Sequence, residues 1–290
     1  MASKYNHLIL DIRDQIGVIK LNRPEFLNAW NEALLAEMVG AVRELNEHPD
    51  TVFTVLTGEG RFFSAGADIR GGLFVPPESS TSAQKKLFYM RKFSAELTLF
   101  TSLIHHSKII VLALNGPGVG GGAAWFTGLA DIVLASSTTY LQVPFSALGL
   151  VPEFGAVKTF AQSIGVRRAN EFLMFGRKCT AQELETWGLI NRVFDAQGEG
   201  FQRAVREYLE KRLEVNDAGS MLESKRLMNA SLREGRLVAL VDAVDALAER
   251  FVAGVPMERF KKRTEELQRA SEARGVKGQD KVMGKVKSSL

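Results

Sequence analysis

The spacing of apolar residues predicts strands and helices in alternation over the first two thirds of the chain. Alternating or continuous apolar runs predict strands at residues 7–12, 17–21, 51–57, 109–114 and 132–135. Helical spacing predicts helices over 31–47, from a Thr81–Gln84 capping box to Ile104, and after Gly122 as far as Leu129. This alternation predicts an α/β fold.

The pattern changes after Asp195, where only helical spacing remains. Helices are expected at residues 199–213, 219–232, 237–252 and 256–272. We therefore expect three parts: a core over 1–195, a helical region over 196–272, and a basic tail over 273–290. A wide apolar stripe between Val238 and Val252 indicates that this helix packs its apolar face against another surface.

Composition and charge exclude several classes of protein. The net charge of +4 comes from the tail, so the body is neutral and a broad nucleic-acid surface is not expected. No apolar run reaches the ~18 residues of a membrane span, so no membrane association is expected. The single cysteine, Cys179, rules out an internal disulfide. With only four histidines besides it, no metal site is expected.

Two glycine-rich loops follow predicted strands. Gly116–Gly121 fits a dinucleotide-binding pattern, but no acidic residue follows about 20 positions later, as that function requires. Its glycines either allow close packing or leave a backbone N–H exposed at a helix start. The loop over Ser64–Asp68 is equally small and could present a second N–H. Two N–H groups converging on one oxygen would form an oxyanion hole.

Such a site also needs a base, and two acidic residues lie between Ile109 and Ile164. Asp131 directly precedes a predicted strand, and we expect it to bond backbone. Glu153 lies among apolar residues, which would raise its pKa as a general base requires. The spacing is equally compatible with an exposed glutamate near a helix start.

The residues considered together resemble the crotonase, or enoyl-CoA hydratase/isomerase, superfamily. The segments that carry the likeness, which covers about residues 8–195, are 21–25, 28–30, 62–69, 115–122, 130–133 and 188–193. The resemblance implies a spiral of ββα units followed by a helical trimerisation region. It also implies an acyl-CoA substrate whose thioester carbonyl binds the N–H groups of Ala67 and Gly121, with no cofactor beyond that coenzyme A.

Departures from the family pattern indicate the type of reaction. Hydratases of this family have two glutamates that hold and activate water, whereas this sequence has Ala124 and Phe145 in their places. A single glutamate at Glu153 is similar to the Δ3,Δ2-enoyl-CoA isomerases, especially the fungal peroxisomal ones. Glu153 would move a proton from C2 of a 3-enoyl-CoA to C4 through a dienolate.

The resemblance also implies binding residues. Coenzyme A would lie along Ala65, Gly66, Asp68 and Ile69, with help from Arg23. Residue type predicts an acyl pocket walled by Trp125, Phe126, Phe145 and Phe154.

The remaining expectations concern location and assembly. Ser288-Ser289-Leu290 is a degenerate form of the peroxisomal Ser-Lys-Leu signal, so we expect peroxisomal import through its receptor, with the cytoplasm as second choice. A homotrimer or a dimer of trimers is expected. The alternative functions are another acyl-CoA hydratase or lyase serving secondary metabolism, and a crotonase-like binding protein without turnover.

Overall fold

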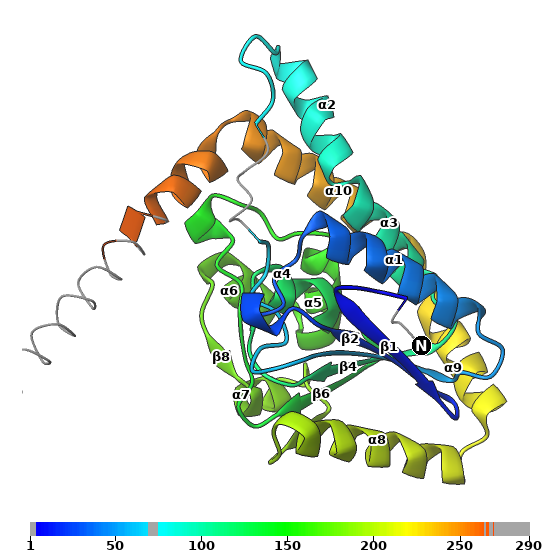
Figure 1. Cartoon of the computed structure of the whole chain (residues 1–290). Coiled ribbons are helices and arrows are strands. Elements are labelled where there is room, and N and C mark those ends of the chain that lie inside the picture. The colour runs from blue at the N-terminus through cyan, green and yellow to red at the C-terminus, as the bar shows by residue number, and fades with distance from the viewer. Residues whose placement is uncertain (1–3, 69–74, 264, 267–268, 270–290) are drawn as a thin grey trace, which may run out of the picture.

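A six-stranded sheet runs through the centre of the molecule, with the strand order β1-β2-β3-β4-β6-β9. The computed structural model describes residues 4–68, 75–263, 265–266 and 269 (Figure 1). The strands of this sheet are β1 (Leu8–Arg13), β2 (Ile16–Leu21), β3 (Phe53–Gly58), β4 (Ile109–Leu114), β6 (Ile132–Ser136) and β9 (Arg192–Phe194). The β1–β2 pair is antiparallel and the other pairs are parallel.

A second, three-stranded sheet has the order β5-β7-β8. Its strands are β5 (Gly118–Val119), β7 (Tyr140–Gln142) and β8 (Cys179–Thr180). The β5 strand, which lies within the second glycine-rich loop, pairs with β7 in parallel. A helix begins at Gly121, directly after β5. This sheet therefore fixes the loop over residues 115–122.

Helices account for most of the rest of the described chain. They are α1 (Glu32–Glu47), α2 (Ser82–Lys92), α3 (Ser94–Ile104), α4 (Gly121–Thr127), α5 (Ala156–Ile164), α6 (Val166–Phe175), α7 (Ala181–Thr186), α8 (Gly198–Val215), α9 (Ala218–Ala230) and α10 (Arg233–Val252). Short 3-10 turns cover Pro24–Phe26 and Ser146–Leu148, and residues 255–263 are largely helical. The expected strands and α/β class are confirmed.

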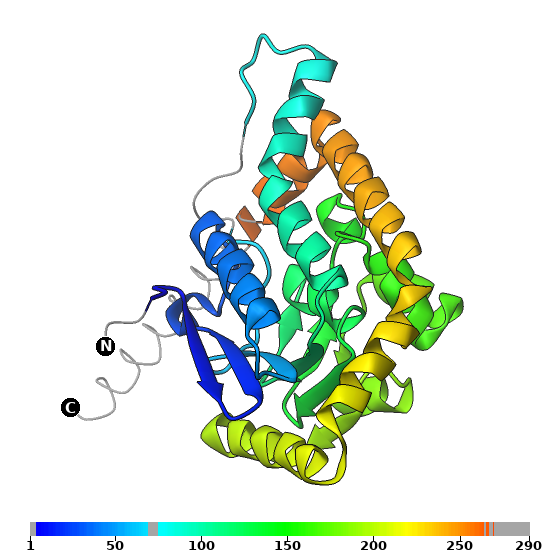
Figure 2. The same cartoon turned by 90° about the vertical axis from the view of Figure 1, so that its right-hand side faces the viewer.

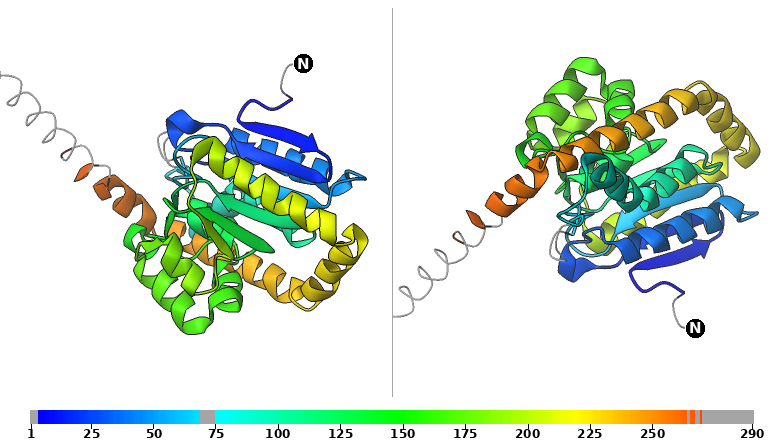
Figure 3. Two further views of the ribbon diagram at one scale, coloured as in Figure 1. Left: turned by 90° about the horizontal axis from the view of Figure 1, so that it is seen from below. Right: turned by 90° about the horizontal axis from the view of Figure 1, so that it is seen from above.

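The central strands β3 and β4 are buried on both faces, which explains their continuous apolar runs. Leu56 and Leu112 belong to the main core with α1, α3 and α4. Their neighbours Val55 and Val111 point to the other face, which α8 covers through Phe201 and two further apolar residues. Figure 2 and Figure 3 show α8 lying across this second face.

The helix expected from the Thr81–Gln84 capping box is present but shorter than predicted. Both hydrogen bonds of the box form, so its start is confirmed. The prediction of one continuous helix to Ile104 is wrong, because Phe93 leaves helical geometry (φ −88°, ψ 8°) and separates α2 from α3. The Phe93 ring packs against Phe251 and Phe154 at this break.

The C-terminal helices contact the core rather than standing apart from it. Helix α10 packs along α2, α3 and α5. None of the described helices is long and apolar enough to cross a membrane. The division at residue 195 stays a prediction, and the whole predicted tail over 273–290, including Ser288-Ser289-Leu290, lies outside the described residues.

Candidate active site

Most backbone N–H groups of the loop over Ser64–Asp68 donate hydrogen bonds within the described chain. Ser64 N–H donates to Pro117, Ala65 N–H to Leu27, and Asp68 N–H to Trp30. Gly66 N–H donates to the Ser64 hydroxyl. Ala67 is the exposed residue of this loop, and within the described chain its N–H has no acceptor.

The start of α4 lies directly against this loop. Val119 N–H donates to the Ser64 carbonyl at 2.9 Å. A Cβ placed on Gly66, whose φ is +88°, would lie 2.8 Å from the Val119 carbonyl oxygen and 3.5 Å from the Gly121 nitrogen. The close approach and the positive φ both require glycine at this position. The structure therefore brings together the two loops that carry Ala67 and Gly121.

Gly121 is the first residue of α4, where backbone N–H groups have no partner within the helix. The hydrogen bonds of this helix begin with Ala123 and Ala124, which both donate to the Gly120 carbonyl. The Gly121 N–H is therefore not used by the hydrogen bonds within the helix, and its role in an oxyanion hole stays a prediction.

Trp125 connects the start of α4 to the predicted base. Its indole lies over Gly121, since a Cβ there would be 2.5 Å from Trp125 Cε2 and 2.8 Å from Nε1. The indole N–H donates to Glu153 Oε2 at 2.7 Å. The edge of one indole ring therefore separates the Glu153 carboxylate from the first residue of α4.

A strained turn presents Glu153 at this point. Phe154 has a φ of +47°, uncommon for a residue with a side chain, and Gly155 follows with a φ of +82°. The Glu153 carbonyl accepts from Ala156, which begins α5. Glu153 is part-buried and is not an exposed glutamate at a helix start. The structure therefore favours the interpretation of Glu153 as a carboxyl group among apolar residues.

Burial changes the acidity of Glu153. Loss of solvation raises its pKa from 4.5 to about 7, the Trp125 hydrogen bond opposes that rise, and the charge of Glu96 adds to it. A carboxyl group with a pKa of about 7 is ionised in about half of the molecules at neutral pH. Glu153 therefore combines partial exposure with the acidity expected of a general base.

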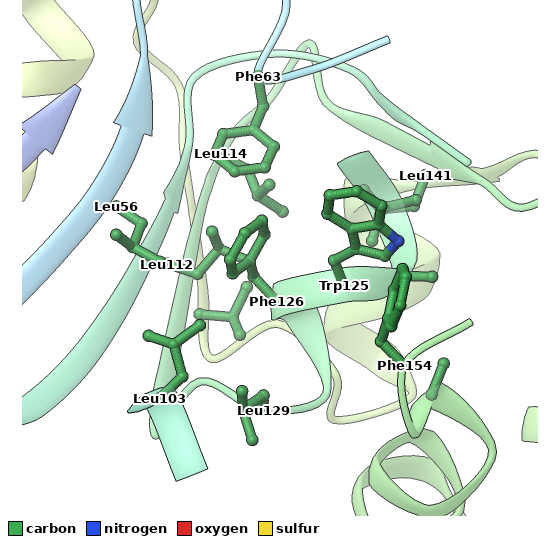
Figure 4. Packing of buried hydrophobic residues seen from close by; sticks show 14 of the residues in the cluster. Leu56, Phe63, Leu103, Leu112, Leu114, Trp125, Phe126, Leu129, Leu141 and Phe154 are labelled. Carbon is green, nitrogen blue, oxygen red and sulfur yellow. The ribbon is translucent and has the colours of Figure 1, made fainter. Parts of the chain in front are cut away.

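A group of aromatic rings includes Trp125, which donates a hydrogen bond to this carboxylate. Trp125 and Phe154 meet edge to face at 5.2 Å, and Phe100 stacks on Phe154 at 5.2 Å. Figure 4 shows Trp125 and Phe154 side by side, while Phe126 lies among leucines. Of the four residues predicted to wall the acyl pocket, the structure thus places Trp125 and Phe154 beside Glu153. Phe126 and Phe145 are buried in the same hydrophobic cluster.

The residues predicted to bind coenzyme A lie along the loop before Ile69, which is itself outside the described residues. Arg23 is buried, and its guanidinium donates to the Ala29 carbonyl and to Asp68 at 3.1 Å. Arg23 therefore holds Asp68 and the end of the loop in place. Its direct contact with coenzyme A, and those of Ala65, Gly66 and Asp68, stay predictions.

Asp131 has the structural role expected of it. Its carboxylate accepts from the Ile110 backbone N–H at 2.8 Å and pairs with Lys225 at 2.7 Å. Asn229 of α9 also donates to it. Asp131 thus joins β4 to α9, on residues separate from the Glu153 site.

Sequence reasoning missed Glu96, a second carboxyl group near Glu153. Its burial raises its pKa to about 7 as well, and its Oε2 atom has no hydrogen-bond partner within the described chain. The signal was present, because Glu96 interrupts an apolar stripe that includes Phe93, Leu97 and Phe100.

The arrangement can support proton abstraction next to a carbonyl. Two backbone N–H groups, at Ala67 and Gly121, would stabilise negative charge on an oxygen, each contributing roughly 10²–10³ in rate. The indole of Trp125 contacts both Glu153 and Gly121, which carries one of these two N–H groups. Among the described residues, no group of histidine, cysteine or acidic side chains could hold a metal ion.

Comparisons with known proteins identify the family of this chain. The family model for enoyl-CoA hydratase/isomerase matches residues 11–265. A Δ(3,5)-Δ(2,4)-dienoyl-CoA isomerase of Pyricularia oryzae is 33% identical over 269 residues, covering 87% of this chain and 94% of that protein. Human enoyl-CoA delta isomerase 2 is 32% identical over 194 residues, covering 67% of this chain and 47% of the human protein.

Solved structures share the fold. An enoyl-CoA hydratase/isomerase from Pseudoalteromonas atlantica superposes with a TM-score of 0.77 at 24% identity, covering 90% of this chain and 98% of its own. One from Mycobacterium paratuberculosis gives 0.76 at 25% identity, covering 89% and 99%. The α/β architecture with two sheets and C-terminal helices is therefore the crotonase fold, and the chain belongs to the enoyl-CoA hydratase/isomerase family.

Proposed function

We propose that this protein is a Δ3,Δ2-enoyl-CoA isomerase that converts 3-enoyl-CoA to 2-trans-enoyl-CoA in fatty-acid β-oxidation. The observation that carries the proposal is the environment of Glu153, a part-buried carboxylate with a pKa of about 7. Both positions where hydratases of this family hold water have apolar side chains here, in Ala124 and Phe145, and both are buried. One base, with apolar side chains at the two positions that would hold water, suits isomerisation better than hydration.

In the proposed mechanism the Glu153 carboxylate takes a proton from C2 of the thioester. The resulting dienolate oxygen accepts hydrogen bonds from the N–H groups of Ala67 and Gly121, which stabilise it more than they stabilise the neutral carbonyl. Protonated Glu153 then returns the proton to C4. The Trp125 indole N–H keeps the carboxylate oriented, and the rings of Trp125 and Phe154 limit access of water to the dienolate.

Two thioesters distinguish this function from its alternatives. We expect the purified protein to convert 3-hexenoyl-CoA to the conjugated 2-trans isomer, with a rise in the ultraviolet absorbance of the conjugated thioester. We expect no 3-hydroxyhexanoyl-CoA from 2-hexenoyl-CoA and water. Hydration would support the hydratase alternative, and binding of both thioesters without turnover would support a non-catalytic binding protein.

We also propose assembly into a trimer or a dimer of trimers and action in peroxisomes. Val238 and Val241 of α10 are each 56% exposed, which supports a partner surface on this helix. The peroxisomal location rests on the sequence Ser288-Ser289-Leu290 alone. Deleting these three residues should leave the protein in the cytosol with its turnover unchanged.

A further inference from the structure

Trp30 borders the loop that carries Ala67, and the mechanism above does not use it. Its backbone N–H donates to the Gly66 carbonyl at 2.8 Å, and its carbonyl accepts from the Asp68 N–H at 2.9 Å. These hydrogen bonds form a parallel bridge between Trp30 and Ala67, so the Ala67 N–H is directed away from Trp30. Paired residues of such a bridge have their side chains on the same face. The Trp30 side chain therefore lies on the same face of the bridge as the Ala67 methyl group.

The Trp30 ring extends from this loop to α4. Its centroid lies 5.4 Å from that of Trp125 and 5.4 Å from that of Phe126. Both of these rings belong to residues predicted to wall the acyl pocket, and the Trp125 N–H donates to Glu153 at 2.7 Å. Trp30 therefore packs against the predicted acyl pocket, and one ring separates it from the Glu153 carboxylate.

The indole N–H of Trp30 is a buried donor without an acceptor. The residue is 3% exposed, and within the described chain its Nε1 atom has no hydrogen-bond partner. An indole nitrogen can only donate, and a buried tryptophan usually finds an acceptor, as Trp125 does in Glu153. A buried donor left unpaired destabilises the folded protein. A ligand atom that accepts from Trp30 would remove this cost.

The chemistry of the surroundings narrows the identity of that atom. In the proposed mechanism the thioester oxygen binds the N–H groups of Ala67 and Gly121, and a hydrocarbon acyl chain has no other acceptor. The rings around Trp30 are apolar, so a carboxylate would be costly to bury there, and a hydroxyl group would leave its own hydrogen unpaired. A keto or ether oxygen only accepts, which matches a group that only donates.

We propose that Trp30 is a specificity-determining residue whose indole N–H binds a keto or ether oxygen on the acyl chain. The site then selects acyl-CoA thioesters with such an oxygen beyond the reacting double bond over thioesters with plain hydrocarbon chains. A site that donates to a substrate oxygen discriminates against the analogue without it, because the donor is then left unpaired. The inference rests on the proposed function in that the same site binds an acyl-CoA thioester. Trp30 takes no part in the proton transfer.

The first test compares 3-nonenoyl-CoA with its 7-oxo and 8-oxo derivatives. In the wild type, kcat/KM should be higher for at least one keto thioester than for the plain one. Trp30→Phe keeps a ring but not the donor, and it should lower this preference by about 5- to 150-fold, the effect of leaving a buried polar group unpaired. Lost packing would affect both substrates alike, so the ratio isolates the hydrogen bond. Trp187→Phe, whose ring contacts Arg168 and Arg177, is the matched control and should leave the ratio unchanged.

The second test observes the indole N–H itself and needs no turnover. The chain has three tryptophans, so protein labelled with ¹⁵N-tryptophan gives three indole signals in an NMR spectrum. Trp30→Phe identifies the Trp30 signal, and Trp125→Phe with Trp187→Phe identifies it by elimination. Binding of saturated 7-oxo- or 8-oxononanoyl-CoA should move the Trp30 proton signal downfield, as a new hydrogen bond does. Binding of nonanoyl-CoA should not.

The outcomes separate this inference from the proposed function. Equal kcat/KM for keto and plain thioesters in the wild type, an equal loss on both in Trp30→Phe, or a Trp30 signal that the keto thioester does not move would overturn the role of Trp30. Each of these results leaves the isomerase proposal standing. A downfield shift on keto-thioester binding, with no isomerisation of any 3-enoyl thioester, would overturn the proposed function and support the contact with Trp30.

Discussion

Replacing Trp125 with phenylalanine tests how the protein sets the acidity of its base. The substitution keeps an aromatic ring between Gly121 and Phe154 but removes the N–H that donates to Glu153 Oε2 at 2.7 Å. That hydrogen bond favours the ionised carboxylate and opposes the effect of burial. Without it the pKa of Glu153 should rise further above its usual value.

The size of the effect follows from the charge on the acceptor. A hydrogen bond to a charged group contributes about 1.5–3 kcal/mol, which corresponds to about one to two pH units. In the wild type, with a pKa of about 7 for Glu153, about half of the molecules hold the carboxylate at pH 7. In Trp125→Phe that fraction should fall to about 1–10%, so isomerase activity at pH 7 should fall by about 5- to 50-fold.

The assay is kcat/KM for 3-hexenoyl-CoA between pH 5.5 and 9.5. Wild-type activity should rise with pH around a midpoint near 7, because the base must lose its proton. The variant should reach its midpoint about one to two pH units higher, the range that corresponds to loss of the Trp125 hydrogen bond, and recover most of the lost rate at pH 9.5. A loss of the same size at every pH, with an unmoved midpoint, would show that Trp125 acts only through packing.

Three further outcomes follow. Gly66→Ala should cost roughly 10²–10³ in kcat/KM, the effect of one oxyanion donor, because its methyl group would press on the Val119 carbonyl and displace Ala67 from Gly121. Urea unfolding should show that the free energy of unfolding of the wild type falls as the pH rises from about 5 to about 8. The raised pKa of Glu153 alone accounts for up to about 3 kcal/mol of this fall, because the folded state binds the proton of the Glu153 carboxyl group more tightly than the unfolded state does. Glu153→Gln should lack this contribution. Light scattering should give three or six times 32.0 kDa, and a monomer mass would remove the trimer proposal.

Much of the architecture could be predicted because it depends on local patterns. The β4 strand was predicted at its observed limits, since a strand buried on both faces is a continuous apolar run. The capping box at Thr81 was visible because its two hydrogen bonds join residues three apart. The break at Phe93 was not visible, because helical spacing continues across it and the rings that pack there come from distant segments.

The candidate site was predictable in its loops but not in its electrostatics. The small residues of Ser64–Asp68 and Gly116–Gly121 indicated two loops that could each present a backbone N–H, and the structure brings those loops together. Whether Glu153 was buried or exposed could not be decided from spacing, since its partner Trp125 comes from another element and the turn depends on a left-handed Phe154. Glu96 was overlooked because it lies within an apolar stripe, where only tertiary packing shows what it faces.

The most direct test of the account is turnover of a 3-enoyl-CoA by Glu153→Gln, with binding of the thioester measured in parallel. Glutamine keeps the size of the side chain and can still accept from the Trp125 N–H, but it cannot take a proton at neutral pH. We expect a loss of about 10²-fold or more in kcat with thioester affinity nearly unchanged, because general base catalysis contributes roughly 10²–10⁴ and the group acts twice. Retention of more than about a tenth of the wild-type rate, less than the smallest loss expected of a general base, would show that Glu153 is not the base.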